Sequence, residues 1–150
     1  MDFYLVQHGK AKPKAVDPER PLSDAGRQET QLVAELAAKL DLDVEEIWHS
    51  GKTRAEQTAA MFGRALPLMG SAIEKSGLNP TDDVKPVADD LRKGKRSIMI
   101  VGHLPFLQRL AGLLVNGDPE DAPVEFHNSG IVCLSREDGD WHVKWQLLPG

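Results

Sequence analysis

The sequence predicts an α/β fold, a three-layer α/β/α sandwich whose central sheet is mainly parallel and has an antiparallel edge at the C-terminus. Three observations lead to this prediction. The short segments 3–6, 44–50 and 97–103 have the length and composition of strands. Stretches with helical spacing separate them, and the C-terminal part of the chain has the alternating pattern of a hairpin. No repeat or linker interrupts residues 1–150, so we expect a single domain.

The N-terminal part of the chain is predicted to form a strand, a long loop and a helix. Residues 3–6 are apolar and aromatic, which is typical of a strand buried on both faces. Residues 9–22 carry three prolines and no periodicity; loops of this length are usually functional or disordered, and we favour function. Ser23 is a suitable N-cap for a helix whose buried face is expected to contain apolar residues three or four positions apart. These residues are Leu32, Val33, Leu36, Ala37 and Leu40.

A second strand and two more helices are predicted in the middle of the chain. Residues 44–50 fit a strand, and helical spacing returns over residues 53–66. Residues 76–81 have the composition of a turn. A short helix is expected from Asp82 onward, and Gly94 would end it.

The C-terminal third contains the clearest strand and a hairpin. Residues 97–103 are predicted to form a buried strand, and residues 104–115 are apolar at helical spacing. Segments 130–137 and 141–148 flank an Asp-Gly dipeptide, which is typical of a tight hairpin turn. We therefore expect the antiparallel edge of the sheet to come from these two segments.

Composition and charge exclude several classes of protein. The chain has a net charge of -5 at pH 7, which argues against broad binding of nucleic acid, because such binding needs a basic face. No signal peptide and no apolar segment long enough to cross a membrane is visible. Cys133 is the only cysteine, so there is no disulfide framework and no thiolate metal site; we interpret it as a small buried hydrophobic residue. These features predict a cytoplasmic protein that contacts neither nucleic acid nor membrane.

Polar residues follow each of the three predicted parallel strands. His8 comes after the first strand, residues 50–54 come after the second, and His103 comes after the third. Ligands of open α/β sheets bind at the carboxyl ends of the strands, so we expect these groups to converge. Each residue also has a structural interpretation: His8 as a core or capping histidine, Arg54 as an exposed helix residue, and His103 as a helix cap. The presence of such residues at all three strand ends is explained better by a shared site than by three separate structural roles.

The residue types fit the chemistry of phosphoryl transfer. A neutral imidazole at His8 can attack phosphorus, and the guanidinium of Arg54 can form bidentate hydrogen bonds with phosphoryl oxygens. The start of a helix adds a positive dipole end. His103, if protonated, would be a further cationic donor. Gly9 follows the nucleophile, where a residue without a side chain permits close approach of phosphate.

Four segments in order resemble the motifs of the histidine phosphatase (phosphoglycerate mutase-like) superfamily. They are LVQHGKA, RPLSDAG, HSGKTRAEQT and VGHLPF, and the short chain is similar in length to the SixA-type phosphohistidine phosphatases. The resemblance implies that His8 becomes phosphorylated and that Arg54 and His103 act on the phosphoryl group. It also implies that Arg20 lies near the pocket, and it implies no metal and no cofactor.

Two positions depart from the family. Gln7 stands where most members have an arginine before the nucleophile, so one charge-assisted interaction worth about 1.5–3 kcal/mol is missing. Lys52, Lys10 or Lys12 would restore this charge through a longer side chain, although exposure to solvent is an equally good explanation for each lysine.

The second departure concerns the general acid. Larger members use a glutamate before the third core strand, and the corresponding stretch here, KSGLNPTDD, has no clear equivalent. Asp82 is the nearest candidate, with a structural role at a helix N-terminus as the favoured alternative. The remaining histidines lack metal-ligand spacing and are interpreted as structural or exposed. They are His49, His127 and His142.

Three functional hypotheses remain open. The first is a metal-independent phosphatase that forms a phosphohistidine intermediate on His8 and acts on a phosphorylated protein, with phosphohistidine as the substrate. The second is a phosphoryl-binding regulatory domain with weak or no turnover, because the arginine is absent. The third is a phosphatase of small phosphorylated metabolites.

Overall fold

The computed structural model describes residues 1–68 and 72–150. The described residues form a six-stranded sheet in the order β3-β2-β4-β1-β5-β6. The strands are β1 (Asp2–Gln7), β2 (Glu46–His49), β3 (Ile73–Glu74), β4 (Ile98–Gly102), β5 (Ile131–Glu137) and β6 (Asp140–Leu147). The helices are α1 (Asp24–Lys39), α2 (Thr53–Ala65), α3 (Lys85–Lys93) and α4 (Phe106–Asn116). None of the helices in the described part of the chain is long and apolar enough to cross a membrane.

The sheet is mixed, and its topology confirms the predicted fold class. β1 and β2 both pair in parallel with β4, and β3 pairs in parallel with β2. β5 is antiparallel to β1, and β6 is antiparallel to β5. The carboxyl ends of β1, β2 and β4 therefore meet at one edge of the sheet, where the polar residues of the predicted site follow them.

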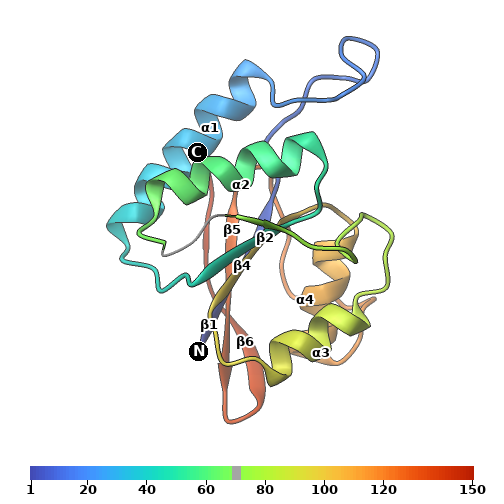
Figure 1. The fold of residues 1–150 in the computed structure, drawn as a ribbon. Helices are drawn as coiled ribbons and strands as arrows, with labels where there is room; N and C mark the ends of the chain where they lie inside the picture. The colour runs from blue at the N-terminus through green and yellow to red at the C-terminus, as the bar shows by residue number, and fades with distance from the viewer. Residues whose placement is uncertain (69–71) are drawn as a thin grey trace.

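The sheet lies between two layers of helices. Helices α1 and α2 cover one face, and α3 and α4 cover the other (Figure 1). Side chains of β1 alternate between the two cores: Phe3 and Leu5 pack toward α3 and α4, and Tyr4 and Val6 pack toward α1 and α2. Burial on both faces explains why β1 is almost entirely apolar.

Helix α1 begins as predicted, but its buried face differs from the prediction. The Ser23 side chain accepts a hydrogen bond from the Gly26 backbone N–H at 3.0 Å, as an N-cap does. The expectation that Leu32, Leu36 and Leu40 are buried was wrong, because they are 45%, 36% and 51% exposed. The helix instead buries an adjacent stripe of small and β-branched residues, which permits close packing. These residues are Gly26, Thr30, Val33, Ala34 and Ala37.

Other boundaries differ by a few residues. Helix α3 begins at Lys85 and not at Asp82, because the Asp82 and Asp83 carboxylates accept backbone hydrogen bonds within turns. The two-residue strand β3 was not predicted. The hairpin was predicted correctly: Asp138 and Gly139 join β5 to β6 with φ of 53° and 84°, as a tight primed turn requires.

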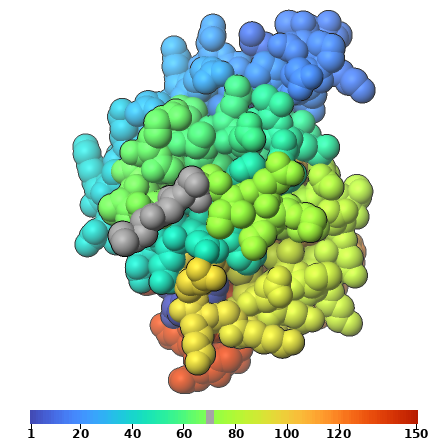
Figure 2. All heavy atoms as spheres, viewed as in Figure 1, coloured from blue at the N-terminus to red at the C-terminus, as the bar shows by residue number. Residues whose placement is uncertain are grey.

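The segment 9–22 is an ordered loop that extends beyond α1 and α2 (Figure 2). Its two ends pair with each other: the Lys12 N–H donates to the Pro21 carbonyl at 2.8 Å, and the Ser23 N–H donates to the Lys10 carbonyl at 2.9 Å. A side chain at Gly26 would collide with the Lys10 carbonyl, so α1 also packs directly on this loop. The loop therefore has a fixed base beside the carboxyl edge of the sheet.

Candidate active site

The structure brings the three predicted strand ends together. The imidazole centroids of His8 and His103 lie 5.1 Å apart. The positive charge of Arg54, in the first turn of α2, contributes to lowering the pKa of both rings. Residues 8, 54 and 103 thus form one cluster, and each comes from a different element of the chain.

Backbone contacts on both sides hold His8 in place. Its N–H donates to the Gly102 carbonyl of β4 at 3.0 Å. Its carbonyl accepts a hydrogen bond from the Asn128 side-chain amide at 2.8 Å. The position of His8 therefore does not depend on its own side chain.

The His8 ring has the protonation state of a nucleophile. Its Nδ1 lies 2.7 Å from the Gly9 carbonyl oxygen, which can only accept, so Nδ1 carries the proton. Burial lowers the pKa of His8, and the charges of Arg54 and Arg20 lower it further, although the Gly9 carbonyl acts in the opposite direction. The ring is therefore neutral at neutral pH, and Nε2 has a free electron pair.

The packing around residue 9 requires a glycine next to His8. Its N–H donates to the Thr58 hydroxyl at 3.0 Å. A Cβ at this position would lie 2.7 Å from Thr30 Oγ1 and 3.0 Å from Ser129 Oγ, which are themselves hydrogen-bonded at 2.8 Å. The interior thus leaves no room for a side chain. The contact of Gly9 with phosphate stays a prediction.

Arg54 has unused hydrogen-bonding capacity. Its buried Nε has no hydrogen-bond partner among residues 1–68 and 72–150, and none of the ion pairs found there includes it. Burial lowers its pKa, and the nearby charge of Arg20 adds to the effect. Arg54 is only partly buried, and a partly desolvated cation without a carboxylate partner in the described residues is stabilised when an anion compensates it. Arg54 is therefore suited to an oxyanion.

The loop 9–22 brings a second guanidinium to the cluster. The charge of Arg20 lowers the pKa of His8, Arg54 and His103. Arg20 itself has φ of 49°, an uncommon conformation for a residue with a side chain, and its Nε donates to the Lys12 carbonyl at 3.2 Å. The structure thus places Arg20 within electrostatic reach of the cluster, as the resemblance implied.

His103 is almost completely buried and is neutral at neutral pH. It is 1% exposed, and its Nε2 lies 2.6 Å from the Ser50 hydroxyl. Burial lowers the pKa of His103 to about 3, with further contributions from His8, Arg54, Lys52 and Arg20. An arriving dianion would offset the positive charges of Arg54, Lys52 and Arg20.

The three lysines considered for the missing charge differ in their surroundings. Lys10 forms an ion pair with Glu29 at 3.3 Å, which occupies its ammonium group. Lys52 contributes to lowering the pKa of His103, so its charge reaches the cluster. Lys12 forms no ion pair in the described residues and does not contribute to the pKa shift of His103. Of the three, Lys52 is the best candidate to supply a further cation.

Gln7 faces a hollow beside the cluster. It lines a cavity of about 480 Å³ together with residues that include Glu29, Leu104 and Asn128. The Oε1 atoms of Gln7 and Glu29 are buried and have no hydrogen-bond partner in the described residues. Contact of Gln7 with phosphate stays a prediction.

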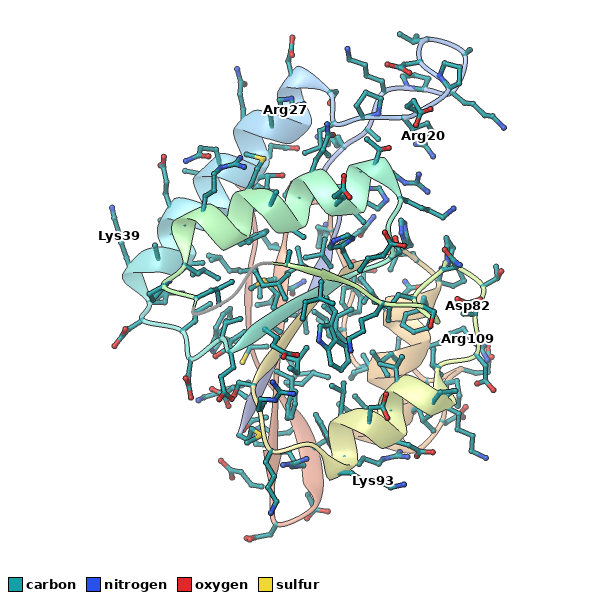
Figure 3. All side chains as sticks on the ribbon, viewed as in Figure 1. Arg20, Arg27, Lys39, Asp82, Lys93 and Arg109 are labelled. Atoms are coloured by element: carbon teal, nitrogen blue, oxygen red, sulfur yellow. The ribbon has the colours of Figure 1, made fainter. Side chains whose placement is uncertain are left out.

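Asp82 lies in the turn before α3, on the same side of the molecule as Arg20 (Figure 3). Its Oδ2 accepts a hydrogen bond from the Asn79 N–H at 2.9 Å. This contact gives Asp82 a structural role in the turn. A role as general acid stays a prediction.

Several residues with a place in the site were not selected from the sequence. Ser50 contacts His103, Thr58 accepts from Gly9 and donates to the Arg54 carbonyl at 2.8 Å, and Asn128 holds the His8 carbonyl. Ser50 and Thr58 belong to the HSGKTRAEQT segment, so the motif itself was the available signal. Asn128 is 120 positions from His8, and its place just before a predicted strand was the only signal for a contact with the site.

The other histidines have the positions expected of structural or exposed residues. His49 is buried, and its Nδ1 accepts a hydrogen bond from the Gly51 N–H at 3.1 Å. His127 and His142 are exposed. Within residues 1–68 and 72–150 there is no group of three or more acidic, histidine or cysteine residues arranged to hold a metal ion.

Comparisons with known proteins assign the chain to a superfamily. The model of the histidine phosphatase superfamily (branch 1) matches residues 3–79, and the chain belongs to this superfamily. It is similar to the phosphohistidine phosphatase SixA of Escherichia coli K12, with 31% identity over 99% of this chain and 94% of that protein.

Solved structures give the same result. A structure of the protein histidine phosphatase SixA complexed with tungstate superimposes with a TM-score of 0.87 at 30% identity, covering 99% of this chain and 97% of that one. A putative phosphohistidine phosphatase SixA from Agrobacterium tumefaciens has a TM-score of 0.78 at 26% identity, covering 99% and 98% of the two chains.

Proposed function

We propose that this protein is a phosphatase that removes a phosphoryl group from phosphohistidine in a protein, through a covalent phosphohistidine intermediate on His8. The observation that carries the proposal is the hydrogen bond of 2.7 Å between His8 Nδ1 and the Gly9 carbonyl. Because the neutral ring has a single N–H, this contact leaves the electron pair on Nε2 available for attack.

In the first step, the electron pair of His8 Nε2 forms a bond to phosphorus. The bond between phosphorus and the substrate nitrogen breaks, and its electron pair leaves with the substrate imidazole, whose other ring nitrogen carries a proton, so that the departing ring is neutral. The transferring group carries negative charge on its equatorial oxygens. Arg54 and Arg20 supply positive charge there, and the N-terminus of α2 adds its dipole.

In the second step, water attacks the phosphorus of phosphorylated His8. The bond from phosphorus to Nε2 breaks, its electron pair returns to the ring, and inorganic phosphate leaves with the oxygen of the water. The same cations stabilise both steps because the phosphoryl group stays in place while its partners change.

The charges of the site favour a substrate with a good leaving group. The side chains whose charges shift the pKa of His8 and His103 are His8, two arginines and a lysine, with no carboxylate among them. An alkyl phosphate needs an acid to protonate the departing alkoxide, whereas imidazole leaves as a neutral group. Similarity to SixA supports the same substrate class.

A comparison of three substrates tests this function. We expect higher kcat/KM with a histidine-phosphorylated peptide than with glucose 6-phosphate, and measurable turnover of p-nitrophenyl phosphate. Preference for the sugar phosphate would favour a metabolite phosphatase. Absence of turnover on all three would contradict the proposed function.

A second candidate function is a phosphoryl-binding domain with little turnover, and Gln7 is the observation that favours it. A neutral amide occupies the position beside the nucleophile, and its buried Oε1 offers no positive charge to phosphate. Such a domain would bind oxyanions through Arg54 and Arg20 without efficient chemistry.

The variant Gln7→Arg separates the two functions. We expect it to tighten binding of vanadate by about 1–2 kcal/mol, because a guanidinium provides charge-assisted hydrogen bonds where an amide provides neutral ones. Calorimetry at two salt concentrations measures the affinity, and turnover is followed in parallel. Native turnover near zero, with strong activity only in Gln7→Arg, would support the binding domain.

Two controls make this experiment specific. Glu29 lines the same cavity and can capture the new guanidinium, so Gln7→Arg is also tested together with Glu29→Gln. Gln28→Arg adds the same charge at an exposed position of α1 and should leave affinity unchanged. A gain in Gln28→Arg equal to that in Gln7→Arg would mean that only net charge matters.

A further inference from the structure

The strongest unexplained feature of the site is the contact between Ser50 and His103. The two residues are 53 positions apart, and Ser50 Oγ lies 2.6 Å from His103 Nε2. The other ring nitrogen, Nδ1, is buried and has no hydrogen-bond partner in the described residues. The contact therefore accounts for one nitrogen of His103 and leaves the other unused.

The geometry points to a specific role for Ser50. We propose that Ser50 is a positioning residue that donates its hydroxyl hydrogen to His103 Nε2 and so holds the ring in the tautomer with N–H at Nδ1. This proposal rests on the proposed function for its catalytic consequence, but the tautomer itself is a property of the free protein.

The length of the contact supports this direction. A hydrogen bond in which an N–H group donates to oxygen is commonly 2.7–3.2 Å long, and hydroxyl donors form shorter contacts, of 2.5–3.0 Å to oxygen. At 2.6 Å, the contact fits an O–H group that donates to nitrogen.

A count of unsatisfied groups gives the same direction. The Lys52 N–H donates to Ser50 Oγ at 3.3 Å, so the hydroxyl oxygen already accepts one hydrogen bond. If the hydroxyl donates to Nε2, the Nδ1–H of His103 is the one polar hydrogen of the two side chains that has no partner in the described residues. If Nε2–H donated to the hydroxyl, both the Ser50 hydrogen and the buried Nδ1 would lack partners. Unsatisfied buried groups are costly, so the first arrangement is favoured.

The tautomer has a chemical consequence for phosphoryl transfer. Phosphoryl oxygens only accept hydrogen bonds, and a group transferred to His8 lies beside the His103 ring, whose centroid is 5.1 Å from that of His8. An Nδ1–H gives this ring a donor even though it is neutral. In the other tautomer, Nδ1 would present an electron pair. Ser50 thus allows a neutral His103 to donate a hydrogen bond to an anionic substrate.

Nuclear magnetic resonance of the native protein tests the tautomer directly. In protein labelled with ¹⁵N-histidine, two-bond ¹H–¹⁵N correlations distinguish protonated from unprotonated ring nitrogens, and His103→Gln identifies the signals of His103. At pH 7 we expect Nδ1 of His103 to be protonated and Nε2 to be unprotonated. Protonation at Nε2 in the native protein would overturn the proposal, whether or not the protein has turnover.

Three variants test the role of the hydroxyl. Ser50→Ala should mix the tautomers of His103 and lower kcat on p-nitrophenyl phosphate about tenfold, the kinetic equivalent of one net hydrogen bond. Ser50→Thr keeps a hydroxyl and should restore both. Ser76→Ala, at an exposed position, should change neither. A loss of kcat in Ser50→Ala with an unchanged His103 tautomer would overturn the proposal, because Ser50 would then act on the substrate itself.

Discussion

Replacing His8 by alanine is expected to abolish the phosphoenzyme and to lower turnover by roughly four orders of magnitude or more, as loss of a nucleophile does. The reason is the hydrogen bond from His8 Nδ1 to the Gly9 carbonyl, which leaves Nε2 with an electron pair free to attack. No other nitrogen of the cluster has this arrangement. Rapid quench with a ³²P-labelled substrate measures the phosphoenzyme, and steady-state kinetics measure turnover.

The variant should keep its fold, because the contacts that hold His8 are made by its backbone. The N–H bonded to Gly102 and the carbonyl bonded to Asn128 are both present in alanine. His142→Ala, at an exposed position of β6, removes an imidazole outside the site and should retain full labelling. Full labelling of His8→Ala would show that another residue is the nucleophile.

Replacing Arg54 by alanine is expected to lower kcat by about two to three orders of magnitude, as removal of one preorganised oxyanion donor does. The same substitution should not lower the stability of the folded protein. The guanidinium has a buried Nε without a hydrogen-bond partner in the described residues, and burial lowers its pKa, so its removal relieves an uncompensated charge. We expect the melting temperature of the empty protein to stay unchanged or to rise.

The same helix offers a matched control. Arg64 lies in the last turn of α2 and is exposed, so Arg64→Ala removes the same group without touching the cluster. It should leave kcat unchanged. A near-native kcat in Arg54→Ala, measured with an unchanged melting curve, would place Arg54 outside the catalytic machinery.

The sequence predicts those parts of the fold in which pattern and burial coincide. β1 and β4 are almost continuous apolar runs because both of their faces are covered, and the Asp-Gly turn identifies the hairpin through its backbone requirement. In α1, apolar residues occupy two adjacent stripes. Periodicity alone does not decide which stripe faces the core, and the larger leucines proved to be exposed.

For the site, sequence order identifies the strand ends but not the contacts between them. His8 and His103 could be predicted because each directly follows a strand, and Arg54 because it lies in the first turn of the helix after β2. Ser50 meets His103 across 53 positions, and Asn128 meets His8 across 120. These pairs depend on the register of the sheet, which is known only once the strands are placed.

The central position of β4 has a consequence for the way the protein is made. β1 and β2 do not pair with each other, and each forms a parallel ladder with β4. On the ribosome, β1 and β2 emerge early but lack their shared partner until residues 98–102 have been synthesised. Such non-local pairing is slow, and unpaired apolar strands are prone to aggregate. β1 therefore lacks its parallel partner while residues 8–97 are made, and β2 lacks it while residues 50–97 are made, so the candidate site can assemble only after His103 has been synthesised.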